Sequence, residues 1–456
     1  MKKLVLFFLV CSTSAWVQAQ KKWTLQECVE YALEHNLQVI QNEISKKNQD
    51  INLKIAKRSY LPTVGANFSN NANFGQNVSS TGLINRTDNY NNSLGVSANV
   101  LIYNNGRLEK QVRKANYDVE ASQYDVETIK NDISLQIAQQ YLSVLLNKEI
   151  EKISQSAQEN AQKQYDRAKI TTDVGTTAQT VLAEAASALA REKQNVKTAE
   201  INTGRNLFAL AQLLQLPNYE DFDVVDVPVY DDMLTSSLQS VNDVLEYAYS
   251  NQPQVKAAES RIKAAEAQTT VTKTAFWPTV TASAGVGTSY YNVLKKQYVT
   301  VQDENGNPYQ VAYDDPQLFK QYKDNFSQQL GLSANIPIFN QGITKLQVEQ
   351  SRLNEELSKN SLEQQKQSVR QNVQKAKFDA DANYEIYLAA VEAEKSTKLS
   401  LDFAEKSYAA GRTTIFDLNV ARNNYANAQG SVAQAKYNYL FSVKLLNFYA
   451  GIPISL

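Results

Sequence analysis

The heptapeptide LGVSANV at residues 94–100 returns as LGLSANI at residues 330–336. In both copies apolar side chains alternate with small polar ones, which is the pattern of a β-strand with one apolar and one polar face. The same alternation runs along four stretches of the chain, namely residues 63–74, 91–102, 280–287 and 329–338. The sequence therefore predicts two pairs of strands, one pair in each half of the chain.

The two heptapeptides belong to a duplication that runs through the whole chain. VEYA at 29–32 recurs as LEYA at 245–248, and LPTV at 61–64 recurs as WPTV at 277–280, both 216 residues later. From the heptapeptides onward the spacing is 236, and it joins Gly106 to Gly342, Gly175 to Gly411, Leu182 to Leu418 and Pro217 to Pro453. The halves therefore align with one insertion, and such a duplication predicts two similar structural repeats.

The duplication also suggests how the chain is divided. We expect an export signal over residues 1–19, a first repeat over 20–217, an acidic connection over 218–237 and a second repeat over 238–456. Each repeat should run helix, strand, strand, long helix, turn, helix. The expected fold class is mixed α and β.

The polar faces of the predicted strands favour a membrane location over a soluble sheet with one hydrated face. Their residues are small and uncharged, and each strand has about the 9–11 residues that a tilted strand needs to cross a bilayer. Lipid-facing positions would be Val64, Phe68, Val96, Val286 and Leu332, and water-facing positions would be Asn67, Ser97, Ser283 and Ser333. The smallest membrane barrels have about eight strands, and an open sheet edge in lipid leaves backbone groups unpaired. Four strands must therefore share a barrel with copies of the chain.

Two segments without glycine or proline, residues 107–174 and 343–410, predict very long helices. Each has 68 residues, which corresponds to about 100 Å of α-helix. In the first, apolar residues from Val126 to Val144 recur with a mean spacing of 3.6, so this helix should carry one apolar stripe. Such lengths suit coiled-coil packing. A filamentous coiled coil is the alternative, but it does not account for strand pairs at the same place in both repeats.

The amino terminus has the pattern of a signal peptide. Two lysines precede an apolar segment at residues 4–10, and the small-residue motif VQA at 17–19 precedes the expected cleavage site. A lipid anchor on Cys11 is the alternative, although Val10 stands where a small residue would precede a lipidated cysteine. Beyond Val10 no run of 18 apolar residues occurs, so a membrane crossing would have to be made by strands.

Composition argues against several function classes. The chain has 456 residues, a formal net charge of −1 and one histidine, His35. Nucleic-acid binding needs a basic surface, and a single histidine does not suggest a histidine metal site or histidine-based catalysis. Cys28 is the one cysteine of the expected mature chain, so no internal disulfide can form.

Residues 303–307 resemble the start of a calcium loop, but Pro308 stands where that loop requires glycine, so we expect a plain turn there. No enzyme activity, cofactor or metal is expected.

In this order of elements the chain resembles the family of TolC-type outer-membrane efflux proteins. The likeness covers roughly residues 24–453 and is carried by Trp23-Thr24-Leu25, Ala32-Leu33, Asn36, Leu61-Pro62, Trp277-Pro278, the turns at 174–176 and 410–413, and residues 435–440. The resemblance implies a homotrimer whose twelve strands form one barrel in outer-membrane lipid, continued by a coiled-coil tunnel through the periplasm.

The resemblance also implies partners and a function. A periplasmic adaptor protein and an inner-membrane pump would meet the far end of the tunnel. The implied function is a passive exit duct for drug efflux or type I secretion. The alternative is a structural or adhesive trimeric coiled-coil surface protein.

Candidate functional residues follow from the resemblance as well. Adaptor docking is implied for the two turns, with Gly175, Thr176, Thr177, Gly411, Arg412 and Thr413. A gate, closed by polar links between neighbouring coiled coils, is implied for Thr180, Tyr408 and Asp417. Helix capping alone is the alternative for the two turns. For Tyr408 and Asp417 the alternative is that they only solvate or cap a helix end. Val181 and Val420 depart from the family pattern, since relatives can carry aspartate there.

The resemblance finally assigns the connections between elements. Residues 75–90 and 291–325 would be extracellular loops. Residues 218–237 would form a belt around the tunnel. This segment contains Glu220, Asp221, Asp223, Asp226, Asp231 and Asp232 and no base, which predicts a solvated acidic connection.

Overall fold

The computed structural model describes residues 22–78, 84–86, 88–227, 240–294, 298–312 and 317–454. The predicted signal peptide with Cys11 lies outside these residues, as do Asp231 and Asp232. The chain forms two compact units. The helical unit comprises Met1–Lys46, Ser122–Ala258 and Ser361–Leu456, and the sheet unit comprises Lys47–Ala121 and Glu259–Asn360.

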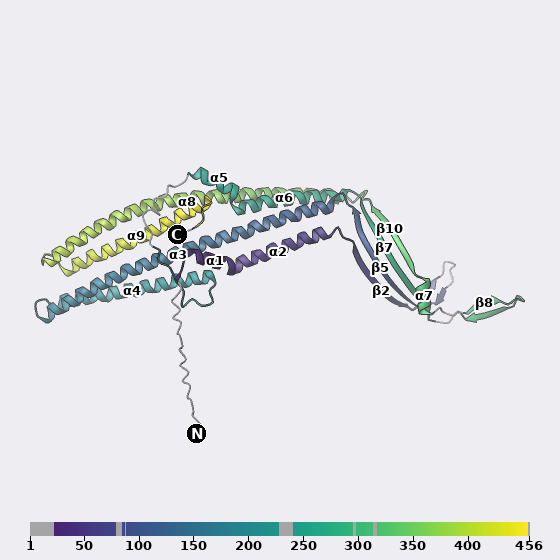
Figure 1. Ribbon diagram of the computed structural model, residues 1–456, viewed down its shortest axis with the longest axis horizontal. Coiled ribbons are helices and arrows are strands. Elements are labelled where there is room, and N and C mark those ends of the chain that lie inside the picture. Colours follow the sequence, from purple (N-terminus) through teal and green to yellow (C-terminus); the bar gives the residue numbers. More distant parts are fainter. Residues whose placement is uncertain are drawn as a thin grey trace, which may run out of the picture. The chain divides into compact units, whose positions relative to one another are not determined.

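Both halves of the chain have the same order of main elements (Figure 1). The helices of the first half are α1 (Leu25–His35), α2 (Leu37–Arg58), α3 (Arg107–Asp173) and α4 (Gln179–Leu214). Those of the second half are α5 (Val241–Asn251), α6 (Pro253–Lys273), the 3₁₀ turn η2 (Thr274–Phe276), α8 (Ile343–Ala409) and α9 (Ile415–Tyr449). Each half begins with two helices where one was predicted, because the backbone is extended at Asn36 and at Gln252. Gln252 precedes a proline, which disfavours helical geometry at that residue.

The two predicted long helices are confirmed. Helices α3 and α8 have 67 residues each, and they begin at the residues expected from the lack of glycine and proline. None of the described helices has a stretch that is apolar enough to span a bilayer.

The main core of the helical unit is built on the predicted apolar stripe of α3. Ile133, Ile137, Tyr141 and Val144 are all at most 2% exposed. They pack in one cluster with apolar residues of α1, α4 and α9, such as Leu440. A second, smaller cluster joins α5 and α6 to α8 and α9. The 3.6-residue spacing thus predicted the buried face of α3 correctly.

The sheet unit contains a four-stranded antiparallel sheet with the order β10-β7-β5-β2. Its strands are β2 (Thr63–Asn73), β5 (Asn89–Tyr103), β7 (Thr279–Val293) and β10 (Ser327–Asn335). In this register Phe68 lies opposite Leu94 and Val96 lies opposite Val286. Directly opposed residues of neighbouring strands point to the same side of a sheet. The predicted apolar residues therefore share one face.

The other face carries small uncharged residues, as predicted. The hydroxyl oxygens of Ser69 and Ser93 are 2.6 Å apart across two strands. A Cβ atom at Gly287 would lie 3.3 Å from the carbonyl oxygen of Leu94, so the backbones approach closely there. Strands β2 and β10 are the two edges, and within the described residues neither has an outer partner.

The connections at the far ends of the strands contain further elements. Strands β3 (Gln76–Val78) and β4 (Ile84–Arg86) pair between β2 and β5, and strands β8 (Tyr298–Gln302) and β9 (Pro308–Ala312) pair between β7 and β10. The β8–β9 turn has Gly306 at φ +81°, and the carboxylate of Asp303 accepts the backbone N–H groups of Asn305 and Asn307. The predicted plain turn is confirmed. The described residues contain no group of side chains suited to hold a metal ion.

A short parallel pair, β1 (Lys22–Trp23) with β6 (Asp223–Val224), lies in the predicted acidic connection. It corrects the prediction of a solvated segment at Asp223, which is half-buried, whereas Glu220, Asp221 and Asp226 are exposed as predicted. The Lys148 ammonium binds the carboxylates of Asp223 and Asp226, the latter at 3.1 Å, and the carbonyl oxygen of Val224 at 3.0 Å. Lys22 lies 3.2 Å from Asp223. Burial by itself raises the pKa of Asp223, but hydrogen bonds from Lys148, the Val224 N–H and Lys22 outweigh it and lower that pKa. The bases come from other elements, so the local composition of the connection did not reveal them.

Lys148→Ala is expected to destabilise the helical unit by about 3 kcal/mol, because it leaves the half-buried carboxylate of Asp223 and the more exposed one of Asp226 without their shared, largely buried cation. Lys148 is 13% exposed, whereas Lys152, which also binds Asp226, is 65% exposed. Lys152→Ala, the matched control, should cost less than about 1 kcal/mol. Denaturant unfolding of both variants measures the difference. Because the pKa of Asp223 is lowered, its contribution is present at neutral pH and is lost as the pH falls through that value. Equal effects of the two substitutions would contradict the role given to Lys148.

Candidate functional site

The turn between α3 and α4 is fixed by its own backbone. Gly175 has a φ of +77°, a left-handed conformation that favours glycine. Its N–H donates to the Thr172 carbonyl at 2.9 Å. The N–H and the hydroxyl of Thr176 both donate to the Thr171 carbonyl at 2.9 Å. These bonds satisfy carbonyl groups that the end of a helix leaves open. Thr177, which follows, is half-buried.

The turn between α8 and α9 repeats this geometry. Gly411 has a φ of +68°, and its N–H donates to the Tyr408 carbonyl at 3.0 Å. The N–H of Arg412 donates to the Ser407 carbonyl at 2.9 Å. Both glycines are exposed and lie where the sequence predicted helix exits. In Figure 1 the two turns lie at the same end of the helical unit.

Asp417 caps the start of α9. Its carboxylate accepts hydrogen bonds from the hydroxyls of Thr414 at 2.6 Å and Thr413 at 2.9 Å. The N–H of Asp417 in turn donates to the Thr414 hydroxyl at 3.2 Å, which completes a capping box. The hydrogen bonds from Thr414 and Thr413 lower the pKa of Asp417. Asp417 therefore caps the start of α9, and a role in a gate stays a prediction.

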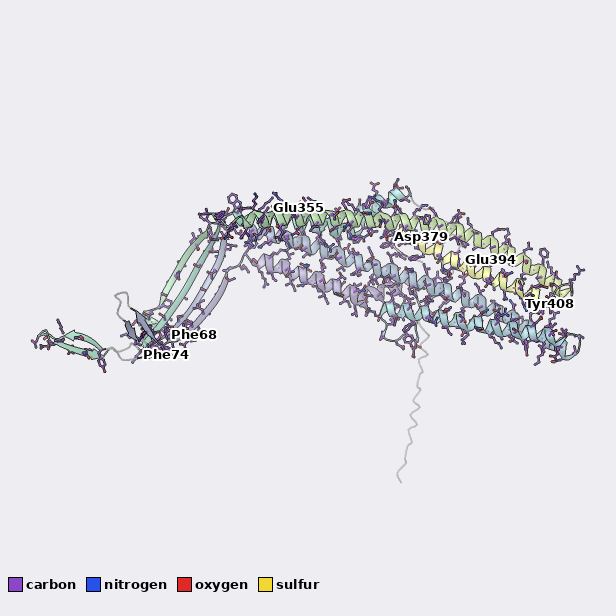
Figure 2. All side chains as sticks on the ribbon, turned by 180° about the vertical axis from the view of Figure 1, so that it is seen from behind. Phe68, Phe74, Glu355, Asp379, Glu394 and Tyr408 are labelled. Atoms are coloured by element: carbon purple, nitrogen blue, oxygen red, sulfur yellow. The ribbon has the colours of Figure 1, made fainter. Side chains whose placement is uncertain are left out.

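Tyr408 has a different setting from Asp417. It is half-buried and lies on the last turns of α8, as Figure 2 shows. Within the described part of the chain, its hydroxyl has no hydrogen-bond partner. Thr180 is exposed in the first turn of α4. In those same residues no hydrogen bond or ion pair joins Thr180, Tyr408 and Asp417. A latch built from these three side chains therefore needs a second copy of the chain.

A groove runs between the helix pair α3–α4 and the helix pair α8–α9, close to the two turns. Its cavity has a volume of about 360 Å³. Apolar and charged side chains line it, including Ile153, Ala188, Phe416, Val420 and Arg422. Arg422 binds Glu405 at 2.9 Å across α9 and α8. We call the end of the helical unit that carries the two turns the tip region. The groove gives this region a concave surface to which all four helices contribute.

Exposed apolar residues around the turns were missed in the sequence. Ile170 and Val174 at the end of α3 are 65% and 68% exposed, and Phe416 at the start of α9 is 65% exposed. Apolar side chains next to the glycine of an exposed turn were the available signal. Exposed apolar residues beside exposed turns are candidates for contact with another protein if they form one contiguous patch.

Comparison with known proteins agrees with this architecture. The family model described as outer membrane efflux protein matches residues 28–215 and 244–451, one stretch in each half. The outer membrane protein TolC of Escherichia coli K12 is 26% identical over 320 residues, which are 69% of this chain and 60% of that protein. The TolC of Salmonella enteritidis is 30% identical over 133 residues, or 29% of this chain and 27% of that protein. The alignments thus span less than two thirds of the length of these relatives.

Several solved structures share the fold. The CusC structure aligns with a TM-score of 0.75 at 16% identity, covering 94% of this chain and 92% of CusC. The Campylobacter jejuni CmeC outer membrane channel aligns with a TM-score of 0.70 at 20% identity, covering 94% and 85%. The open state of the Neisseria gonorrhoeae MtrE channel gives 0.71 at 20% identity, covering 94% and 89%. At such identities the likeness shows the fold.

The family match covers most of the chain and includes both helix–turn–helix ends. The predicted resemblance and the outer-membrane location are thereby confirmed. The chain belongs to the outer membrane efflux protein family, the TolC-type channels of the outer membrane.

Proposed function

We propose that three copies of the chain form one passive channel across the outer membrane, through which an efflux pump or a type I secretion system exports its substrates. The observation that carries this proposal is a sheet with one continuous apolar face and two open edges. A sheet in lipid must pair both edges, and one chain supplies four strands. Three copies supply twelve, which exceeds the minimum of about eight.

Exposed apolar stripes on two helices support the same assembly. Ile51 and Ile55 on α2 are 52% and 59% exposed, and Leu346, Leu353 and Leu357 on α8 are 56–64% exposed. Their spacings of four and seven residues are those of a coiled-coil seam. Helix α2 leads into edge strand β2, and α8 follows edge strand β10. Each sheet edge is therefore continued along the chain by a helix with an exposed apolar stripe, and neighbouring copies can cover both.

The two turns are proposed to dock a periplasmic adaptor, which connects the channel to an inner-membrane pump. The left-handed glycines, Gly175 and Gly411, present the turns, and Ile170, Val174 and Phe416 supply exposed apolar surface beside them. Thr176, Thr177, Arg412 and Thr413 complete this docking surface. The channel itself performs no chemical step, since the pump supplies the energy. Thr180, Tyr408 and Asp417 are proposed to close the resting channel through contacts between subunits.

Leu353→Glu is expected to prevent trimer assembly. Each of the three subunits would then bury an unpaired charge in a subunit interface, and each buried charge costs several kcal/mol of assembly free energy. Native mass spectrometry of the purified protein should give three copies for the wild type and at least about tenfold less trimer for the variant. Asn354→Glu is the matched control, since Asn354 is the next residue on α8, exposed and off the stripe. It should assemble normally.

Conductance in planar bilayers then tests the function itself. The wild-type trimer should form ion-conducting pores, whereas an adhesive coiled coil should form none. A monomer that conducts, or a trimer that never conducts under any condition of opening, would contradict the proposed channel.

A further inference from the structure

Helix α7 (Leu318–Asp324) lies along the edge of strand β7, past the last residue of β7 that pairs with β10. Strand β10 begins at Ser327, opposite Gly287, so beyond Gly287 no strand among the described residues pairs with that side of β7. The buried side chain of Gln321 takes the place of a strand. Its amide nitrogen donates to the Tyr291 carbonyl, and its amide oxygen accepts the Tyr291 N–H, both at 2.8 Å. Asn325 donates to the Ser289 carbonyl at 2.7 Å.

The helix also reaches over the apolar face of the sheet. The hydroxyl of Tyr322 donates to the side-chain oxygen of Asn92 at 2.6 Å, and its ring meets that of Tyr290 at a centroid distance of 6.5 Å. Asn92 and Tyr290 are directly opposed in the β5–β7 register, two and four residues from Leu94 and Val286 on the same side. Helix α7 therefore lies at the loop end of the face that we assign to lipid.

The surface of α7 combines apolar and basic residues. Phe319 is 82% exposed and Leu318 is 39% exposed, and Phe326, two residues after the helix, is 54% exposed. Lys320 and Lys323 are both exposed. Aromatic rings with polar tips and long basic side chains are typical of a membrane–water interface.

Aromatic residues gather at both ends of the sheet. The loop end has Tyr90, Tyr290 and Tyr322, which contact one another in sequence. The helix end has exposed aromatic residues that flank the strands, namely Tyr60, Tyr103, Phe276, Trp277 and Phe339. Membrane strands are bounded by two such girdles. Helix α7 belongs to the girdle at the loop end.

We propose that α7 is an interfacial anchor, in which Leu318 and Phe319 enter the outer leaflet and Lys320 and Lys323 bind the phosphate groups of anionic lipid headgroups. This inference rests on the proposed function, because it requires the apolar strand face to lie in lipid. The lipid surface is favoured over a protein partner, since Tyr322 holds α7 against Asn92 at the loop end of the apolar strand face.

The test uses a fluorophore at position 319, attached to the mature Phe319→Cys protein (residues 20–456, without Cys11) in vesicles. Cys28 does not compete for the label, because it is fully buried and burial raises its pKa to about 12. In phosphatidylglycerol vesicles we expect quenching by lipid-attached nitroxides and loss of quenching by aqueous iodide. Glu304→Cys, in the exposed β8–β9 turn, is the control and should show the opposite pattern. Leu318→Cys repeats the measurement if Phe319→Cys assembles poorly.

Two further comparisons separate the possible outcomes. Adding Lys320→Gln and Lys323→Gln should reduce nitroxide quenching at position 319 to its level in phosphatidylcholine vesicles, and an unchanged signal would overturn the phosphate contact. Leu332→Cys reports the strand face itself. If position 332 is in lipid and position 319 is open to iodide, the anchor is wrong while the channel stands. If both are open to iodide, the proposed membrane channel fails as well.

Discussion

Val96→Arg is expected to abolish assembly in the outer membrane, whereas Ser97→Arg, at the next position, should insert almost normally. Val96 lies in β5, between β2 and β7, and is opposed by Ala66 and Val286 on the apolar face. An arginine at the middle of the bilayer costs about 2–4 kcal/mol, so three copies cost about 6–12 kcal/mol. That sum is comparable to the whole stability of a folded protein.

Ser97 is a matched control because it lies on the same strand and faces the other way. Its neighbours in the register are Gly65 and Gly285, which leave room for a longer side chain in the proposed water-filled lumen. The measurement is the amount of trimer in isolated outer membranes. Further comparisons are available within the other strands, namely Val64 or Phe68 against Asn67 in β2, Val286 against Ser283 in β7, and Leu332 against Ser333 in β10. Equal yields within such pairs would show that the assignment of faces is wrong.

Elements with a sustained local pattern could be predicted from the sequence. The long helices α3 and α8 followed from the lack of glycine and proline, and the strands from alternation over nine or more residues in three of the four cases. The duplication added weight to both, because each pattern appears twice. The turns at Gly175 and Gly411 could also be predicted, because a left-handed residue at the end of a helix is most often glycine.

Features that depend on distant contacts could not be predicted in this way. Helix α7 has seven residues, and its place is decided by side-chain bonds to Tyr291, thirty positions earlier. The acidic residue Asp223 looked solvated because its main partner, Lys148, lies on another element. Capping at Asp417 was readable in principle, since a threonine three residues before an acidic residue is the pattern of a capping box. That pattern predicts the local capping role. A role in contacts between subunits cannot be predicted in this way, because the sequence of one chain does not say where the neighbouring chains lie.

Tyr408→Phe combined with Thr180→Ala is expected to raise the resting conductance of the channel. In a single chain the Tyr408 hydroxyl is half-buried beside the turn at Gly411 without a partner among the described residues. A bond to a neighbouring subunit would satisfy it in the closed trimer. Removing one such hydrogen bond costs about 1 kcal/mol. Across three symmetric copies, this shifts a balanced closed–open equilibrium by roughly a hundredfold. Single-channel recording in planar bilayers measures the change, and cells with the variant should admit large antibiotics.

Tyr165→Phe is the matched control for this gate. Tyr165 is also half-buried on a long helix of the tip region, α3, and the substitution removes the same hydroxyl group. Its conductance should equal that of the wild type. If both variants conduct alike above the wild type, the helices have loosened in general and no specific latch is present. If the double variant conducts like the wild type, the latch lies elsewhere, and the exposed apolar residues Ile170, Val174 and Phe416 become the next contacts to test.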